Sequence, residues 1–184
     1  MDSINKYYKM INIKKSETIK NFKGLLKLCI DNSSYFSLTK NYCIPSSPQL
    51  EFLLSKLNYF QIKQFNTIDW HCYHVKEINP LTIYIFSITD AKNIEKIFLN
   101  SDFVNIFLNT NPNLEDNGYM GYIEDLCFFS KSNIIFGTVS HESICNIYPK
   151  SIKMYEKFSK YAQWEKRDIT NKNSSEYLNI NDYI

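Results

Sequence analysis

Apolar residues recur with two different periods along this chain, and the order of these periods decides the fold class. A helical period predicts four helices, over residues 16–30, 48–60, 91–99 and 149–164. The second helix is the most clearly marked, because Ser47 can cap it and Pro48 suits the first helical position. Leucines at positions 50, 53, 54 and 57 give this helix one apolar stripe. The stripe predicts that the helix packs on a flat apolar partner, as a sheet would provide.

Runs of β-branched and aromatic residues predict the strands of that sheet. They fall at residues 7–13, 35–39, 68–76, 81–88, 103–108, 122–130 and 134–140. Turn residues at 77–80 and 131–133 join two pairs of these runs as antiparallel hairpins. Strands and helices do not alternate regularly. We therefore predict an α+β fold, with a mainly antiparallel sheet of about five to seven strands and three to four helices packed against it.

The length of 184 residues suits one domain with a sizeable core. We expect a single globular α+β domain over residues 1–168, followed by a polar C-terminal tail over residues 169–184. No window approaches 18 consecutive apolar residues, so no membrane span and no membrane partner are expected.

Four glycines in 184 residues are few, and the common glycine-rich motifs are missing. The sequence contains no GxGxxG, no GxxxxGK[ST] and no GxSxG, so we expect no nucleotide cofactor and no serine-hydrolase elbow. The 21 Lys and Arg residues nearly balance the 19 Asp and Glu residues, and Arg167 is the only arginine. Nucleic-acid binding is not expected from this balance.

The five cysteines are widely spaced and form no CxxC pair. The first ten residues, MDSINKYYKM, also lack the apolar core of a secretory signal. We interpret the cysteines as reduced thiols of a cytoplasmic protein. The bias toward Ile, Asn, Lys and Tyr is typical of an AT-rich bacterial genome.

The segment Ser140-His141-Glu142 raises the question of acid-base chemistry. One hypothesis makes His141 the general acid or base of a small hydrolase, tuned by Glu142 or Glu124. The other makes Ser140 the cap of a turn, with His141 and Glu142 near backbone groups at a strand end. Adjacent residues on a strand point apart, so Glu142 is poorly placed to orient His141. The structural hypothesis is favoured, and a non-catalytic role with it.

A metal-dependent enzyme is a further alternative. On one strand over residues 68–76, Cys72 and His74 would share a face and could be two ligands of one metal. His141 and Cys145 could complete a Cys2His2 set, which zinc accepts in tetrahedral geometry. These four residues do not have the spacing of a recognised zinc module. The favoured expectation is therefore no metal, with Cys72 inward on the strand and the imidazoles at a partly wet surface.

One interior stretch is rich in turn residues and is a candidate contact surface. Residues 109–119, NTNPNLEDNGY, form a loop of a length that is often functional. The binding residues that we predict in this loop and the adjoining hairpin are Asn113, Glu115, Asp116, Tyr119 and Tyr122.

Two segments carry a resemblance to a known group. Residues 121–129 (GYIEDLCFF) and 135–142 (IFGTVSHE) resemble a pattern in small bacterial proteins grouped with the immunity proteins of polymorphic toxin systems. The resemblance implies a bacterial, cytosolic, non-catalytic protein that binds another protein and blocks a cognate toxin. Immunity proteins against nucleases are often strongly acidic, whereas this chain is slightly basic. Either the toxin is not a nuclease, or the resemblance misleads.

Overall fold

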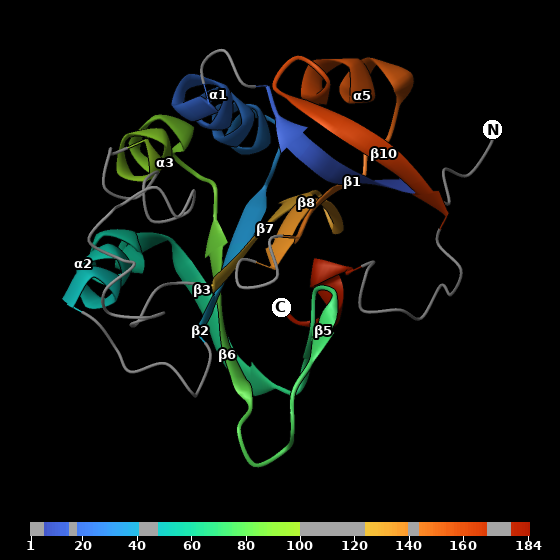
Figure 1. Ribbon diagram of the computed structural model, residues 1–184. Coiled ribbons are helices and arrows are strands. Elements are labelled where there is room, and N and C mark those ends of the chain that lie inside the picture. Colours follow the sequence, from blue (N-terminus) through green and yellow to red (C-terminus); the bar gives the residue numbers. More distant parts are fainter. Residues whose placement is uncertain (1–5, 15–17, 41–47, 100–123, 140–143, 169–177) are drawn as a thin grey trace, which may run out of the picture.

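The computed structural model describes residues 6–14, 18–40, 48–99, 124–139, 144–168 and 178–184 (Figure 1). Its helices are α1 (Thr18–Asp31), α2 (Pro48–Leu57), α3 (Ala91–Phe98) and α5 (Ile152–Phe158), with 3-10 turns η2 (Asn58–Phe60) and η5 (Ile180–Asp182). Its strands are β1 (Lys6–Ile13), β2 (Tyr35–Lys40), β3 (Gln61–Thr67), β4 (Asp69–Trp70), β5 (Tyr73–His74), β6 (Leu81–Ser87), β7 (Glu124–Ser130), β8 (Asn133–Val139), β9 (Ile144–Ile147) and β10 (Ala162–Asp168). This is the predicted α+β class.

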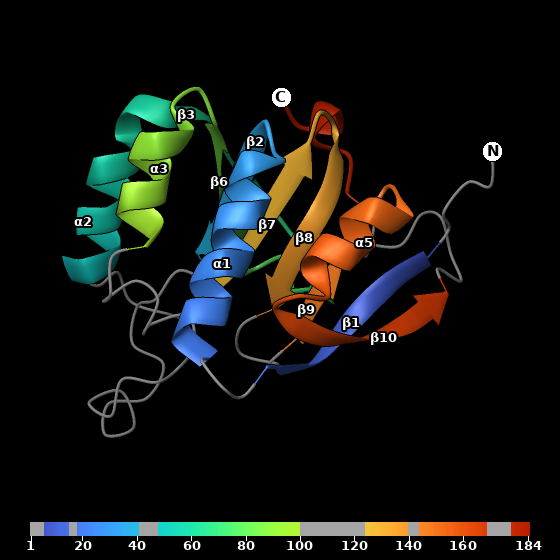
Figure 2. The same cartoon turned by 90° about the horizontal axis from the view of Figure 1, so that it is seen from above.

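Eight of these strands form one antiparallel sheet. Within the described ranges the strand order is β10-β1-β9-β8-β7-β2-β6-β3, and β4 and β5 form a separate small hairpin. Both ends of the chain contribute to one end of the sheet, because β1 lies between β10 and β9. Figure 2 shows the helices along one side of the strands. None of the helices in the described part combines the length and the apolar character that crossing a bilayer requires.

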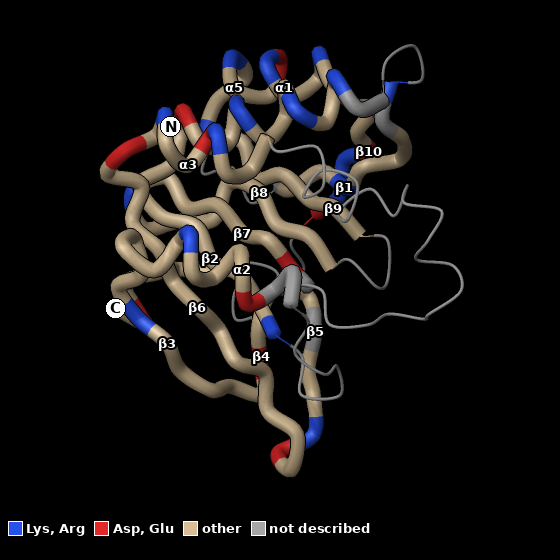
Figure 3. Tube along the Cα trace, turned by 90° about the vertical axis from the view of Figure 1, so that its left-hand side faces the viewer, with Lys and Arg blue, Asp and Glu red and all other residues tan. Residues whose placement is uncertain are grey.

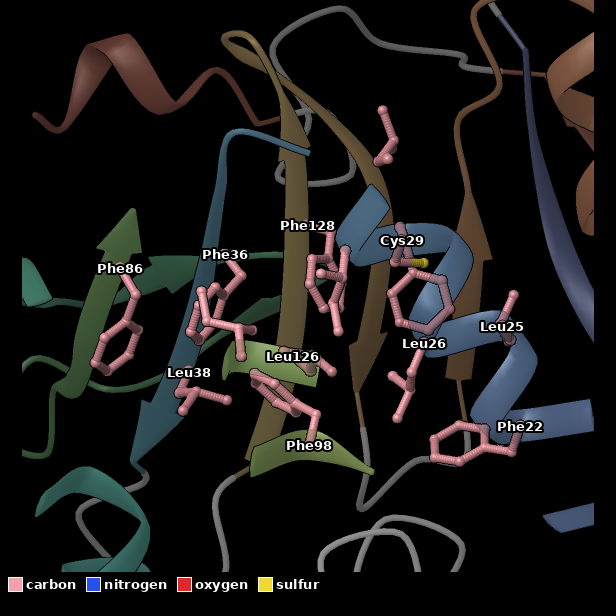
Figure 4. Close-up of a cluster of buried hydrophobic side chains, with 14 of the residues drawn as sticks. Phe22, Leu25, Leu26, Cys29, Phe36, Leu38, Phe86, Phe98, Leu126 and Phe128 are labelled. Carbon is pink, nitrogen blue, oxygen red and sulfur yellow. The ribbon is translucent and has the colours of Figure 1, made fainter. Parts of the chain in front are cut away.

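Two apolar clusters hold this sheet in place. The first lies between the sheet and the helices, where Phe36 of β2 stacks on Phe86 at 4.7 Å and meets Phe98 of α3 edge-on at 5.1 Å (Figure 4). The second lies on the opposite face, where Trp70 and the C-terminal residues Leu178 and Ile180 cover Ile83, Ile85 and Phe129. Apolar side chains are thus buried on both faces of the central strands, which is why these strands are nearly continuous apolar runs.

Local signals predict several elements well. The hairpin of β7 and β8 turns at Lys131 and Ser132 as expected, and Lys131 has the positive φ of 57° that such a turn uses. Asp90 caps α3 through a bond from the Asn93 amide at 3.0 Å. The helices at α1, α2 and α3 and the strands at β1, β2 and β6 also lie where the periodicity predicts them.

The predicted count of five to seven strands is wrong, because the described residues already supply eight to the main sheet. β3 is a polar edge strand, and β9 has only four residues, so neither gives a strong apolar pattern. β10 begins inside the segment predicted as the last helix, because its first three residues, 162–164, belong to the predicted range 149–164. The spacing from Phe158 to Ala162 fits a helix, but Ala162 instead pairs with Ile13 of β1.

Residues 68–76 do not form the single strand that was predicted. The chain reverses within them, so that Asp69 pairs with His74 and Trp70 pairs with Tyr73. Cys72 adopts a φ of 60° at this reversal. The predicted hairpin between residues 68–76 and 81–88 is also wrong, because β6 pairs with β2 and β3.

The predicted strand at residues 103–108 and the predicted loop at 109–119 lie outside the described residues. The last seven residues belong to the packed structure: Ile180 is fully buried, and its amide donates to the carbonyl of Ser132 at 2.7 Å.

Candidate functional site

The β4–β5 hairpin places one histidine in the protein interior. Beneath the hairpin, Ser37, Cys127, Gly137 and Asn146 form a row across four neighbouring strands. These side chains are small or polar, and Gly137 has none, so the row leaves room for the His71 ring. A Cβ atom at Gly137 would lie only 2.4 Å from His71 Nε2. His71 is fully buried in this position.

Burial determines the protonation of His71. Loss of solvent lowers the pKa of the imidazole, and a hydrogen bond to the Gly137 backbone raises it, so that the pKa falls from 6.5 to about 4. The ring is therefore neutral near pH 7. The pKa rise from that bond indicates that the imidazole donates to the Gly137 carbonyl, since such a bond favours the protonated form. Tyr148 meets the ring edge-on at 5.8 Å.

Cys72 follows His71 and contacts the same ring. Its Sγ lies 3.5 Å from His71 Nδ1 and 3.4 Å from Nε2, so the sulfur is almost equally close to both ring nitrogens. Asn146 Nδ2 lies 3.3 Å from the same sulfur. A catalytic thiolate normally has a protonated imidazole beside it, and His71 is neutral. The pair of Cys72 and His71 is thus better suited to holding the hairpin on the sheet than to nucleophilic catalysis.

The three predicted metal ligands that the structure describes do not come together. His74 is at the surface, where its Nδ1 lies 2.7 Å from Asp69 Oδ1 across the hairpin. Cys145 is buried in the cluster between sheet and helices, while its neighbour Asn146 reaches Cys72 on the opposite face. Within the described ranges, no group of three or more His, Cys, Asp and Glu side chains could hold a metal ion. The fourth candidate, His141, lies outside those ranges.

The predicted catalytic set is described only in part. His141 and Glu142 lie outside the described residues, and of Glu124 only the backbone is described, at the start of β7. The neighbouring Asp125 is fully buried and adopts a φ of 51° where the pairing of β2 with β7 is irregular. Burial raises the pKa of the Cys127 thiol, and Asp125 raises it further. Burial likewise raises the pKa of Cys29 and Cys145, so these three thiols stay protonated and unreactive.

The predicted binding residues Asn113, Glu115, Asp116, Tyr119 and Tyr122 all lie outside the described ranges. A different surface stands out within them. Phe52 on α2, Tyr59 on η2 and Ile62 on β3 are 62%, 89% and 46% exposed. Phe52 and Tyr59 are seven residues apart on continuous helical backbone and therefore share a side of it. We call these three residues the edge patch.

The edge patch adjoins the less protected edge of the sheet. β3 is the last strand at its end, so among described strands it pairs with β6 alone. The sequence of β3 has one charged residue, Lys63, whereas β10 at the other edge has Glu165, Lys166, Arg167 and Asp168. Charged side chains discourage the addition of a foreign strand. A register shift lies between Gln61 and Lys63, and pairing is regular from Lys63 to Thr67.

Sequence reasoning missed the edge patch, although a signal for it exists. The leucine stripe of α2 was assigned to the buried face, and Leu57 is indeed fully buried. Phe52 and Tyr59 fall off that stripe, and large aromatic residues off the buried face of a helix are candidates for contacts with another molecule.

Fold and site together define an α+β protein with an aromatic surface beside a sheet edge. Comparison with protein-family models, with curated proteins and with solved structures finds no match.

Proposed function

We propose that this chain acts without catalysis by binding another protein, and that the edge patch is part of its contact surface. The observation that carries the proposal is the gathering of Phe52, Tyr59 and Ile62 within eleven residues at one end of the sheet. Tyr and other aromatic side chains anchor interfaces because they bury a large area at low entropic cost. Exposed apolar groups that are clustered, and not scattered singly, are typical of interaction sites.

The edge patch supplies apolar area that a partner could bury. Full burial of one large apolar side chain contributes about 1.5–3 kcal/mol, so three of them could supply several kcal/mol of binding free energy before the costs of association. The Lys56 ammonium lies 5.0 Å above the Phe52 ring and gives the patch a polar neighbour. An apolar centre with a polar rim is the usual composition of an interface.

The adjacent edge of β3 supports the same proposal. A partner segment in extended conformation could pair with the outward backbone groups of residues 63–67 while its side chains contact the edge patch. The chemistry of the described residues also favours binding over catalysis, because His71 and three thiols are buried in uncharged forms.

In its narrower form, the proposal makes the partner a toxin and this chain a bacterial immunity or antitoxin component. That form rests on the resemblance of residues 121–129 and 135–142 to immunity proteins. The loop at residues 109–119 remains a proposed second part of the contact surface. The alternative, a small hydrolase or metal-dependent enzyme centred on His141, has no support among the described residues.

The test is recovery of the partner with wild-type and altered protein from cells that express the chain naturally. We expect Phe52→Ala/Tyr59→Ala to lose the partner, and Ile78→Ala to keep it, since Ile78 is 80% exposed but lies away from the edge patch in the 75–80 loop. Equal recovery with all three proteins would contradict the proposal. For the narrower form, the recovered partner should be toxic when it is expressed without this chain.

A further inference from the structure

Lysines gather at the opposite end of the molecule from the edge patch. Lys131 lies in the β7–β8 turn, Lys150, Lys153, Lys157 and Lys160 lie on or beside α5, and Lys14 follows β1. All six side chains are exposed. Figure 3 shows lysines predominating where α1 and α5 lie. We call these six residues the lysine strip.

Backbone and side-chain contacts join the members of the strip. Lys150 Nζ donates to the carbonyl of Ser130 at 2.8 Å, next to Lys131. Partial burial and the nearby Lys131 ammonium together lower the pKa of Lys150. At the other end of α5, the Lys14 amide donates to the carbonyl of Tyr161 at 3.1 Å, which brings Lys14 beside Lys160. The strip thus runs from the β7–β8 turn along α5 to the end of β1.

The positive charge of the strip is not neutralised by the part of the chain that the structure describes. None of its six ammonium groups makes an ion pair with a described carboxylate, whereas Lys27 on α1 contacts both Asp31 and Glu95. Glu156 is the only acidic residue on α5. The whole chain has a formal net charge of only +2, so this concentration reflects the arrangement of charges and not a basic composition. Like charges held close together cost stability, which a bound anion would recover.

We propose that the lysine strip is a second contact surface, and that it binds an acidic protein surface. This inference rests on the proposed protein-binding function for the nature of its partner, and charge complementarity argues for an acidic one. Ile152, 78% exposed between Lys150 and Lys153, supplies one apolar contact within the positive field. Lysines on a helix can each follow a separate carboxylate, because their side chains are long and flexible.

Nucleic acid fits the strip less well than an acidic protein does. The strip contains no arginine, and Arg is the usual residue for bidentate contacts to phosphate. The aromatic rings nearby are used inside the protein: Tyr155 packs on Tyr8 at 4.4 Å, and Trp164 meets Phe158 at 6.1 Å. They are not available as stacking platforms for bases.

A membrane surface also fits less well. A helix that lies in a membrane interface inserts an apolar face, and the apolar face of α5 is turned toward the core by the fully buried Phe158. Ile152 is the one strongly exposed apolar side chain on α5. A single isoleucine supplies little insertion free energy.

The test compares two charge reversals of equal size with labelled poly-L-glutamate as the probe. Lys153→Glu/Lys157→Glu/Lys160→Glu changes the strip, and Lys76→Glu/Lys92→Glu/Lys96→Glu changes three exposed lysines elsewhere. Both variants alter the net charge equally. We expect the strip variant to bind the probe at least about tenfold more weakly than wild type, and the control variant to stay within about threefold. Thermal unfolding checks that both variants remain folded. If the strip variant does not fold, Lys153→Gln/Lys157→Gln/Lys160→Gln is measured in its place.

Duplex DNA and vesicles of phosphatidylglycerol are measured beside the probe at the same salt concentration. Tighter binding to either of them than to poly-L-glutamate would overturn the proposal, as would equal losses in the two variants or no binding by wild type. Phe52→Ala/Tyr59→Ala should bind the probe as wild type does. A failure of the edge patch in its own test therefore remains distinguishable from a failure of the lysine strip.

Discussion

His71 is a titratable side chain without access to solvent, held against the backbone of Gly137. A neutral imidazole suits this position, and a protonated one would be a buried charge without a carboxylate partner among its described contacts. The sequence could not reveal this role, because it depends on a strand that lies more than sixty residues away and on the absence of a side chain at Gly137. Sequence reasoning instead assigned His71 to a partly wet strand surface.

Stability should therefore fall in mild acid. The pKa of His71 is about 4 in the folded protein and about 6.5 in the unfolded chain, so the unfolded chain binds the extra proton between these values. The contribution of the neutral His71 to the free energy of unfolding is complete above pH 6.5 and declines as the pH falls toward 4. By pH 5 the free energy of unfolding should be lower by about 2 kcal/mol on this account. Urea unfolding at several pH values measures it.

The control for this prediction is a pair of substitutions. His71→Gln should flatten the pH dependence between 6.5 and 4, whereas Ile78→Ala, at an exposed residue without an ionisable group, should leave it unchanged. The comparison concerns slopes, so a general loss of stability in His71→Gln does not affect it. Parallel slopes in all three proteins would show that His71 is not buried as described.

Gly137 and Gly24 offer a matched test of the close approach to His71. A Cβ at Gly137 would meet a fully buried imidazole at 2.4 Å, while one at Gly24 would meet the partly exposed Tyr161 ring at 2.3 Å. The imidazole has no room to move, so Gly137→Ala should cost about 1–3 kcal/mol of stability. The Tyr161 ring can shift, and Gly24→Ala gains up to about 1 kcal/mol of helix propensity. An unfolding midpoint for Gly137→Ala equal to that of wild type would contradict the described packing.

At the scale of elements, the sequence predicts what local signals determine. The cap at Asp90, the leucine stripe of α2 and the Lys131 turn are each encoded within a few residues, and the structure has the corresponding elements. β10 shows the limit. Its first residues, 162–164, continue the helical spacing, and they lie in a strand because β1, about 150 residues earlier in the chain, pairs with them.

The last residues of the chain show the same dependence on distant partners. Composition predicts a polar tail, yet Ile180 is fully buried and Tyr183 stacks on Phe65 of β3 at 5.3 Å. This segment covers part of the sheet face that the helices leave open. It should therefore behave as an element of the fold.

Truncation of side chains in this segment tests that expectation. Ile180→Ala should lower the free energy of unfolding by about 2–4 kcal/mol, because it leaves a cavity in the second apolar cluster. Ile184→Ala, at a residue that is 45% exposed, should cost less than about 1 kcal/mol. Chemical denaturation of the two variants measures the difference. Equal, small effects would mean that the segment is not part of the packed fold.

At the scale of the whole molecule, the two proposed surfaces lie at opposite ends of the sheet. The edge patch is beside α2 and β3, and the lysine strip follows α5 near β1 and β10 (Figure 1). One is apolar and adjoins a weakly charged edge, and the other is positively charged. A partner that used both would have to span the helical side of the molecule.

The sequence alone does not give the position of either surface. Phe52, Tyr59 and Ile62 are exposed because α2 packs its other face, with Leu53, Leu54 and Leu57, on the core, and because β3 is the last of the described strands in the sheet. Both facts require the fold. The lysines of α5 are visible as a row in the sequence, but their continuity with Lys14 and Lys131 depends on pairing between distant strands.

Site-specific photocrosslinking can show whether the edge patch binds a protein. A photoreactive phenylalanine analogue is introduced at Tyr59 or, as the control, at Ile78, both strongly exposed. In cells that express the chain naturally, we expect one discrete protein adduct from position 59, and Phe52→Ala in the same chain should reduce it at least about fivefold. No adduct at position 59, or the same adducts from both positions, would contradict this expectation.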